Sequence, residues 1–185
     1  MTGGSGDQVD VTPRPAHPPN PTPQLAPPPL LILRTETLAP EQTTAVGSRV
    51  GGLLASGDLV ILDGPLGAGK TAFIRGLAQA LDVAGPVTSP TFVIARHHRP
   101  RRAGGCGLVH VDGFRVTDIS EIDQLDLDTD LAEAVIAMEW GTGLAERLTG
   151  DRLSVRIRRS LDRAASWRSI EVHGHGGRWA GVHLP

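Results

Sequence analysis

The residues from Gly64 to Thr71 follow the pattern G-x-x-x-x-G-K-T, in which glycines precede a lysine and a threonine. Glycines let the backbone fold so that its N–H groups point inward at an anion. The lysine ammonium reaches the β- and γ-phosphates of a nucleotide, and the threonine hydroxyl is a hard oxygen ligand suited to Mg²⁺. The spacing predicts the phosphate loop of a P-loop NTPase, formed by Gly67, Ala68, Gly69, Lys70, Thr71 and Ala72.

Lys70 is the only lysine among the 18 basic residues, since all the others are arginine. A compact ammonium on a flexible stem reaches phosphate oxygens that a planar guanidinium cannot. The single lysine lies at the one motif position that demands it, which supports the assignment. A second lysine-bearing motif, such as the N-K-x-D element that recognises guanine, is impossible in this chain, so ATP is favoured over GTP.

Two carboxylates follow apolar runs that read as buried strands. Asp112 follows Leu108–Val111, and Glu139 follows Ala134–Met138. Ligands of open α/β sheets bind at the carboxyl ends of the strands, so we expect both side chains at that edge. One of them would hold Mg²⁺ while the other positions the attacking water. The residues alone do not decide which carboxylate holds Mg²⁺ and which positions the attacking water.

The elements around the loop follow in the order that phosphate binding requires. Glycine-rich residues 64–69 lie between an apolar run and an amphipathic segment, which predicts a strand, a loop and a helix. We therefore expect an α/β fold, a three-layer sandwich with a mostly parallel central sheet and antiparallel C-terminal strands. In the first half we predict strands at Leu30–Leu33 and Leu59–Leu62, with helices from about Pro40 and over Thr71–Leu81.

The second half is expected to complete the sheet. The apolar runs there are short and alternate with loops rich in Arg, His, Gly or Asp. We predict strands at Thr91–Ala95, Leu108–Val111, Ala134–Met138, Arg152–Arg158 and Ser169–His173, a loop at Arg96–Gly107, a short helix within Asp118–Glu133 and another at Thr142–Leu148.

Length and composition limit the number of domains, the classes of partner and the cellular compartment. The 185 residues suit one domain over 30–185, preceded by a tail at 1–29 that holds nine of the 15 prolines and is expected to be disordered. A net charge of −2 argues against a general nucleic-acid coat. The single cysteine fits a reducing compartment, and neither a signal peptide nor a membrane-spanning run is evident. A cytoplasmic location without membrane contact is expected.

Several stretches together resemble the bacterial TsaE-type ATPases, which support threonylcarbamoylation of adenosine 37 in tRNA. The resemblance covers about residues 35–170, where order and spacing agree. Pro65 replaces an acidic residue that is usual in the family, and this change removes no ligand. The stretches are Glu41–Gly47, Asp63–Thr71, Thr88–Phe92, His110–Arg115 and Glu139–Trp140.

This resemblance implies roles for individual residues. Thr43 would lie near the adenine, and Trp140 beside the site. Thr71 and Glu139 would ligate Mg²⁺, which leaves Asp112 as a catalytic carboxylate together with Lys70. Residues 89–91 would sense the γ-phosphate, and a C-terminal arginine, for which we choose Arg168, would contact the nucleotide.

The resemblance also implies partners. The chain would hydrolyse ATP, slowly when alone, to reset a complex with TsaD-type and TsaB-type proteins, and it would meet tRNA only indirectly. Two rival functions remain open. A small-molecule P-loop kinase would use Arg96–Arg102 as an arginine-rich lid, and a non-catalytic module would bind nucleotide without hydrolysing it.

Overall fold

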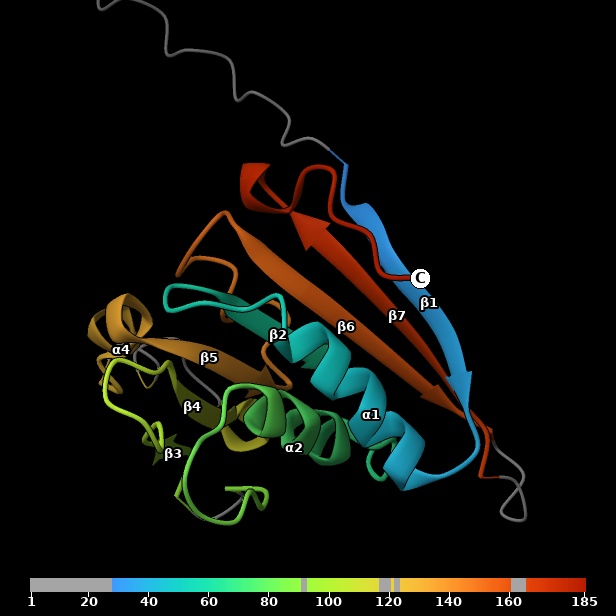
Figure 1. The fold of residues 1–185 in the computed structure, drawn as a ribbon, viewed down its shortest axis with the longest axis horizontal. Coiled ribbons are helices and arrows are strands. Elements are labelled where there is room, and N and C mark those ends of the chain that lie inside the picture. The colour runs from blue at the N-terminus through green and yellow to red at the C-terminus, as the bar shows by residue number, and fades with distance from the viewer. Residues whose placement is uncertain (1–27, 91–92, 117–120, 122–123, 161–165) are drawn as a thin grey trace, which may run out of the picture.

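The computed structural model describes residues 28–90, 93–116, 121, 124–160 and 166–185 (Figure 1). The tail expected to be disordered, residues 1–29, lies outside the described residues except for its last two prolines. The described part forms a mixed sheet with helices packed against it. None of the described helices is both long and apolar enough to cross a membrane.

One sheet of seven strands organises the molecule, in the order β1-β7-β6-β2-β5-β4-β3. Strands β6, β2, β5 and β4 are mutually parallel and form its centre, and a mostly parallel centre was predicted, although without β6. Antiparallel pairing adds β7 and β1 at one side and β3 at the other. The strands span Leu30–Thr37 (β1), Leu59–Asp63 (β2), Ala95–His98 (β3), Gly107–Asp112 (β4), Ala134–Glu139 (β5), Arg152–Arg159 (β6) and Arg168–His175 (β7).

Two helices, α1 (Pro40–Gly51) and α2 (Lys70–Ala80), lie side by side on one face of the sheet (Figure 1). Pro40 begins α1, where its missing N–H costs nothing. The two helix backbones approach closely at Gly47 and Gly76, because a Cβ at either position would overlap the backbone of the other helix. Short helices are found at Leu127–Glu133 (α4), Gly113–Arg115 (η1) and Gly177–Trp179 (η2).

The central strands are buried on both faces. In β2, Val60 and Leu62 pack in the core beneath α1 and α2, whereas Leu59 and Ile61 belong to a second core on the opposite face. That second core is closed by Leu127 of α4 and by the turns after β5. The predicted three layers are therefore present over β2, β5 and β4.

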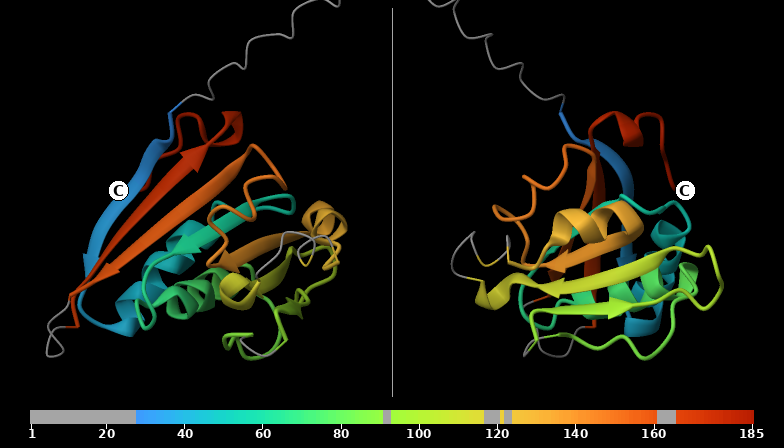
Figure 2. Two further views of the ribbon diagram at one scale, coloured as in Figure 1. Left: turned by 180° about the vertical axis from the view of Figure 1, so that it is seen from behind. Right: turned by 90° about the vertical axis from the view of Figure 1, so that its left-hand side faces the viewer.

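The other half of the sheet is covered by described helices on one face only. Leu153, Val155 and Ile157 of β6 face the helices, and the residues between them, such as Arg156 and Arg158, point the other way. Figure 2 shows this second face from behind, with β6, β7 and β1 running across it. Among the described residues no helix covers it, so the third layer predicted from sequence is seen there only as turns near Thr142 and Glu146. In addition, β6 pairs parallel with β2, which extends the parallel set beyond what we expected.

The predicted strand at 91–95 and the predicted loop at 96–107 are wrong in their boundaries. Residues 91 and 92 lie outside the described part. The N–H groups of Val93 and Ile94 both donate to the carbonyl of Pro90, and Ile94 has a φ of 61°. The chain therefore turns at this point, and β3 begins only at Ala95, the last residue of the predicted strand, and continues to His98, inside the segment expected to be a loop.

The predicted helix at 142–148 is also wrong, because these residues form successive turns. Gly143 has a φ of 84°, in the left-handed region that interrupts a right-handed helix. The N–H groups of Leu144 and Ala145 both donate to the carbonyl of Gly141, which closes a single turn. Ala145 is nevertheless fully buried, so the segment still closes the second core.

The C-terminal residues return to the first strand. The N–H of Leu184 donates to the carbonyl of Ile32 at 3.0 Å, and Val182 packs against the core. Figure 1 shows the end of the chain running beside β1. Arg178 ties the preceding turn to Asp58 at 3.2 Å. The outer edge of β1 is thereby partly covered.

Candidate functional site

The main cavity lies where β2 ends and the Gly64–Thr71 loop leads into α2. Its volume is about 560 Å³, within the range of about 300–1,000 Å³ that small ligands occupy. The loop turns sharply because Gly64 and Gly69 adopt φ values of 150° and 108°, which side-chain-bearing residues rarely adopt. At Gly64 a Cβ would also overlap the carbonyl of Ile157. Sequence reasoning placed this loop correctly.

Lys70 is almost completely buried, with 4% of its surface exposed. Its Nζ donates to the carbonyl of Gly64 at 2.8 Å and to that of Pro65 at 3.3 Å, and it lies 3.9 Å from the centroid of the Trp140 ring. Burial lowers the pKa of Lys70, and the charges of Glu139 and Asp112 only partly oppose this effect. The ammonium is held within the loop, next to the cavity.

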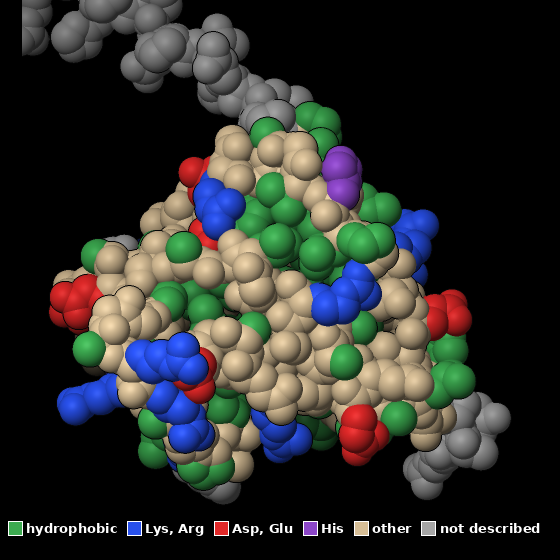
Figure 3. All heavy atoms as spheres, viewed as in Figure 1, with side chains coloured by type: hydrophobic (Ala, Val, Ile, Leu, Met, Phe, Trp, Pro, Cys, Tyr) green, Lys and Arg blue, Asp and Glu red, His purple; other side chains and the backbone are tan. Residues whose placement is uncertain are grey.

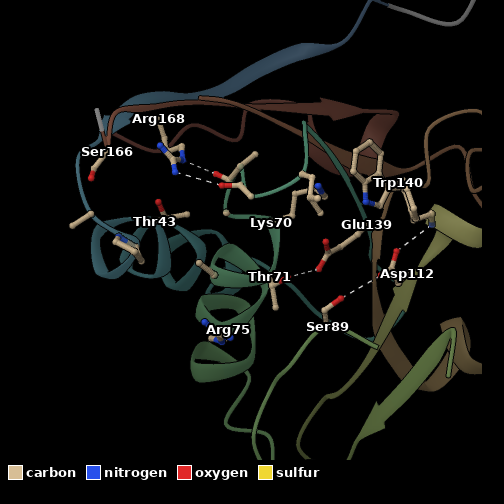
Figure 4. Close-up of a pocket in the computed structure, with 18 residues that line it drawn as sticks. Thr43, Lys70, Thr71, Arg75, Ser89, Asp112, Glu139, Trp140, Ser166 and Arg168 are labelled. Carbon is tan, nitrogen blue, oxygen red and sulfur yellow. Dashed lines mark hydrogen bonds between the residues drawn. The ribbon is translucent and has the colours of Figure 1, made fainter. Parts of the chain in front are cut away.

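Glu139, at the end of β5, joins the helix to the sheet. Its Oε1 accepts a hydrogen bond from Thr71 Oγ1 at 2.8 Å (Figure 4). The same oxygen lies 3.1 Å from His110 Nε2. Burial pushes the pKa of this carboxyl upward, but the hydrogen bonds from His110 and Thr71 and the charge of Lys70 together leave the pKa lowered. Glu139 is therefore held as a carboxylate at neutral pH.

Asp112 lies next to Glu139, since the two residues are partners in the β4–β5 register. One oxygen accepts from Ser89 Oγ at 3.2 Å and the other from the N–H of Phe114 at 3.1 Å (Figure 4). The segment that includes Ser89 thus contacts a site carboxylate. Thr91, the last residue of the segment expected to sense phosphate, lies outside the described residues.

Thr43 and Arg168 approach the loop from opposite ends of the chain. Thr43 Oγ1 lies 2.9 Å from Thr37 Oγ1, which fixes the side chain at the cavity wall. Arg168 donates to the carbonyl of Ala68 at 3.0 Å and, more weakly, to that of Gly67 at 3.4 Å (Figure 4). Arg168 therefore anchors the loop in addition to lining the cavity.

Every residue to which we assigned a catalytic, nucleotide-binding or metal-ligating role from sequence lines this one cavity, whereas of the segment 89–91 only Ser89 does so among the described residues. Sequence reasoning gave no role to Arg75 and Ser166, which also line it, nor to His110 beneath it. The alternation of β4 could have indicated His110, because it shares a face with Asp112. The assigned residues are Thr43, Gly67, Ala68, Gly69, Lys70, Thr71, Ala72, Asp112, Glu139, Trp140 and Arg168.

The arginine-rich segment 96–102 lies elsewhere. Arg101 and Arg102 pair with Asp82 at 3.6 and 3.4 Å, beyond the end of α2. Figure 3 shows basic side chains gathered around an acidic one at the lower left of the face that carries α1 and α2. All seven residues of the segment are described and none lines the cavity. This placement weakens the lid expected of a small-molecule kinase.

The donor set indicates which groups the cavity could hold. Backbone amides at the start of α2 and the ammonium of Lys70 suit phosphate oxygens. Thr71 and Glu139 supply hard oxygen donors, which Mg²⁺ prefers. Among the described residues there is no cluster of three or more His, Cys, Asp or Glu side chains that could hold a metal. Magnesium ions in proteins commonly take several of their ligands from phosphate and water.

Comparison with known proteins agrees with this geometry. The family model "Threonylcarbamoyl adenosine biosynthesis protein TsaE" matches residues 37–167, which include all the assigned site residues except Arg168. The chain belongs to the TsaE family. The TsaE match begins at the end of β1 and runs to the last residue before β7.

Individual TsaE relatives support the same assignment. A protein of Mycobacterium bovis named tRNA threonylcarbamoyladenosine biosynthesis protein TsaE is 55% identical over 136 residues, which cover 69% of this chain and 81% of that protein. The protein of the same name from Streptomyces coelicolor is 52% identical, over 73% and 92% of the two chains. The crystal structure of Bacillus subtilis YdiB superposes with a TM-score of 0.63 at 28% identity, covering 81% of this chain and 90% of that one.

Proposed function

We propose that this chain is a Mg²⁺-dependent ATPase that acts in the threonylcarbamoylation of adenosine in tRNA. One observation carries the proposal: the only lysine, a threonine and two strand-end carboxylates converge on a single cavity at the start of α2. The names of the TsaE family and of the relatives above supply the pathway.

Each residue has a distinct task in the proposed reaction. Lys70 would exchange its bonds to the carbonyls of Gly64 and Pro65 for bonds to the phosphates. The N–H groups at the start of α2 would bind the same phosphates and orient the triphosphate. Asp112 would orient the attacking water, since its carboxylate lies beside Glu139 and already accepts two hydrogen bonds.

Thr71 and Glu139 would hold the magnesium ion. Bound there, Mg²⁺ neutralises the charge that develops on the phosphate oxygens. Glu139 suits this task because its lowered pKa keeps it ionised. Its hydrogen bond with Thr71 already brings the two oxygen donors together.

We further propose that hydrolysis resets a complex with TsaD-type and TsaB-type proteins, without transfer of the threonylcarbamoyl group by this chain. The TsaE family name supports a place in this pathway. No arginine finger of the chain itself was evident from sequence, so we expect slow turnover by the isolated protein. Purified candidate partners should be retained on this chain in an ATP-dependent manner.

The decisive experiment measures phosphate release and nucleotide binding with the purified chain. Lys70→Ala should lose nucleotide binding, whereas Glu139→Gln should lower turnover and raise the Mg²⁺ requirement more than it weakens binding. Glu146→Gln is the matched control, because Glu146 lies outside the cavity and accepts a hydrogen bond from Gly143. Unchanged turnover in Glu139→Gln would refute the metal assignment.

The same preparation separates the rival functions. Appearance of a phosphorylated acceptor when ATP is supplied with small-molecule candidates would indicate a kinase. Binding of ATP without phosphate release, even with the partners added, would indicate a non-catalytic module. Phosphate release alone supports the ATPase.

A further inference from the structure

His110 lies beneath the cavity without lining it. It occupies the middle of β4, on the same face as Leu108 and Asp112, and no part of it is exposed. The β4–β5 register pairs it with Ala137, so its ring reaches diagonally to Glu139. The distance from His110 Nε2 to Glu139 Oε1 is 3.1 Å.

The direction of this hydrogen bond follows from the carboxylate. An ionised carboxylate only accepts, so His110 Nε2 must carry the hydrogen. The other ring nitrogen, Nδ1, has no partner among the described residues. A buried polar atom without a partner costs free energy, which an apolar side chain at this position would avoid. The bond to Glu139 is the one interaction that accounts for an imidazole here.

The two oxygens of Glu139 are used differently. Oε1 meets both Thr71 and His110, which belong to different elements, α2 and β4. No described residue donates to Oε2, and Glu139 lines the cavity. Two donors on one oxygen fix the rotation of the carboxylate and leave the other oxygen free to accept a cation or water.

We propose that His110 is a positioning residue that orients Glu139 for Mg²⁺. The inference rests on the proposed function, because it concerns the same site. Residues that orient metal ligands commonly change metal affinity by about 10- to 100-fold when they are removed. His110 should therefore affect the Mg²⁺ requirement and not the affinity for nucleotide without metal.

The test measures binding of fluorescently labelled ADP to the full chain as a function of Mg²⁺ concentration, with and without EDTA. His110→Leu removes the donor and should raise the Mg²⁺ concentration for half-maximal tight binding by about 10-fold or more. Affinity in EDTA should stay unchanged. His110→Gln keeps an N–H donor of similar reach and should restore most of the Mg²⁺ response.

The matched control is His98→Leu. His98 is also a buried histidine with an unpartnered Nε2, but it lies on β3 and makes no hydrogen bond with Glu139. This variant should keep the wild-type Mg²⁺ response. If His110→Leu does not unfold cooperatively, His110→Asn replaces it, since its shorter amide cannot reach Glu139.

The possible outcomes are distinct. Equal Mg²⁺ responses in wild type and His110→Leu would overturn the positioning role, and so would equal impairment in His110→Leu and His110→Gln, which indicates packing alone. In a Glu139→Ala background, His110→Leu should have no additional effect, and an additive effect would also overturn it. If wild type shows no Mg²⁺-dependent binding at all, the proposed function itself fails.

Discussion

The ammonium of Lys70 lies 3.9 Å from the centroid of the Trp140 ring. Trp140 directly follows Glu139, adopts a φ of 60°, and donates its N–H to the carbonyl of Leu62 at 3.0 Å. This conformation turns the chain at the end of β5 and brings the indole over the phosphate loop. The proposed metal ligand, Glu139, is therefore adjacent in sequence to Trp140, whose ring packs on Lys70.

We expect Lys70→Arg to weaken ATP binding by about 10-fold or more, although the charge is kept. The planar guanidinium does not fit the buried position between two loop carbonyls and the Trp140 ring. Isothermal titration calorimetry with ADP and Mg²⁺ would measure the loss. Arg34→Lys serves as the control, since the Arg34 side chain is 64% exposed and lies outside the cavity. Wild-type affinity in Lys70→Arg would show that charge alone suffices.

Arg168 should act mainly as an anchor for the loop. A lysine there keeps the charge but cannot donate to both the Ala68 and Gly67 carbonyls in the same planar arrangement. We therefore expect Arg168→Lys to resemble Arg168→Ala, with faster hydrogen exchange in the loop and weaker nucleotide binding. Hydrogen-exchange mass spectrometry reports the first effect. If Arg168→Lys binds as wild type does, Arg168 supplies charge to the nucleotide instead.

Gly76→Ala should destabilise the fold by about 2 kcal/mol, as overpacking of a close contact typically does. The added methyl group would meet the carbonyl of Thr44 where α1 and α2 cross. Gly52→Ala is the matched control, because Gly52 has a right-handed conformation and its Cβ would make only ordinary contacts, at 3.5 Å or more. Urea denaturation compares the two, and similar midpoints would contradict the close packing of the helices.

The stability of the protein should fall as the pH drops below 6.5, partly because of His98. Burial lowers the pKa of His98 below its ordinary value of 6.5, and the charges of His110, Arg96 and His97 lower it further against one hydrogen bond with Ala84. Between the lowered pKa of His98 in the folded protein and its ordinary pKa in the unfolded chain, the unfolded chain binds more protons than the folded protein. The free energy of unfolding therefore decreases as the pH falls through this window, and it levels off below the folded-state pKa.

Removing His98 should flatten this pH dependence. Denaturation curves of His98→Leu between pH 5 and pH 7, chosen to span the ordinary value, would show a smaller change in the free energy of unfolding than wild type. His175, whose pKa burial also lowers, would retain part of the slope. His183→Gln is the control, since His183 is exposed and is not among the groups that shift the pKa of His98. An unchanged slope in His98→Leu would contradict the prediction.

The site was more predictable from sequence than the sheet around it. The loop from Gly64 to Thr71 is local, so its residues and spacing carry the whole signal. Asp112 and Glu139 each end an apolar run, and this pattern was enough to place both at one edge. The parallel centre of the sheet followed from the strand, loop and helix at its start.

What could not be predicted depends on contacts between distant residues. The bond from Arg168 to Ala68 spans 100 positions, and that between His110 and Glu139 spans 29. The start of β3 depends on the left-handed conformation of Ile94, which its residue type does not favour. The face of β6, β7 and β1 that no described helix covers follows from the order of strands, which no single segment encodes.

The return of the C-terminal residues to β1 has a consequence for association. An edge strand of a sheet exposes unpaired amide and carbonyl groups, which can pair with a strand of a second molecule. The bond from Leu184 to Ile32 occupies part of that edge. At the opposite edge, β3 is only four residues long and carries Arg96 and His97. Both edges of the sheet are therefore poor sites for the addition of a strand from another molecule. We expect this protein to contact other proteins through side chains.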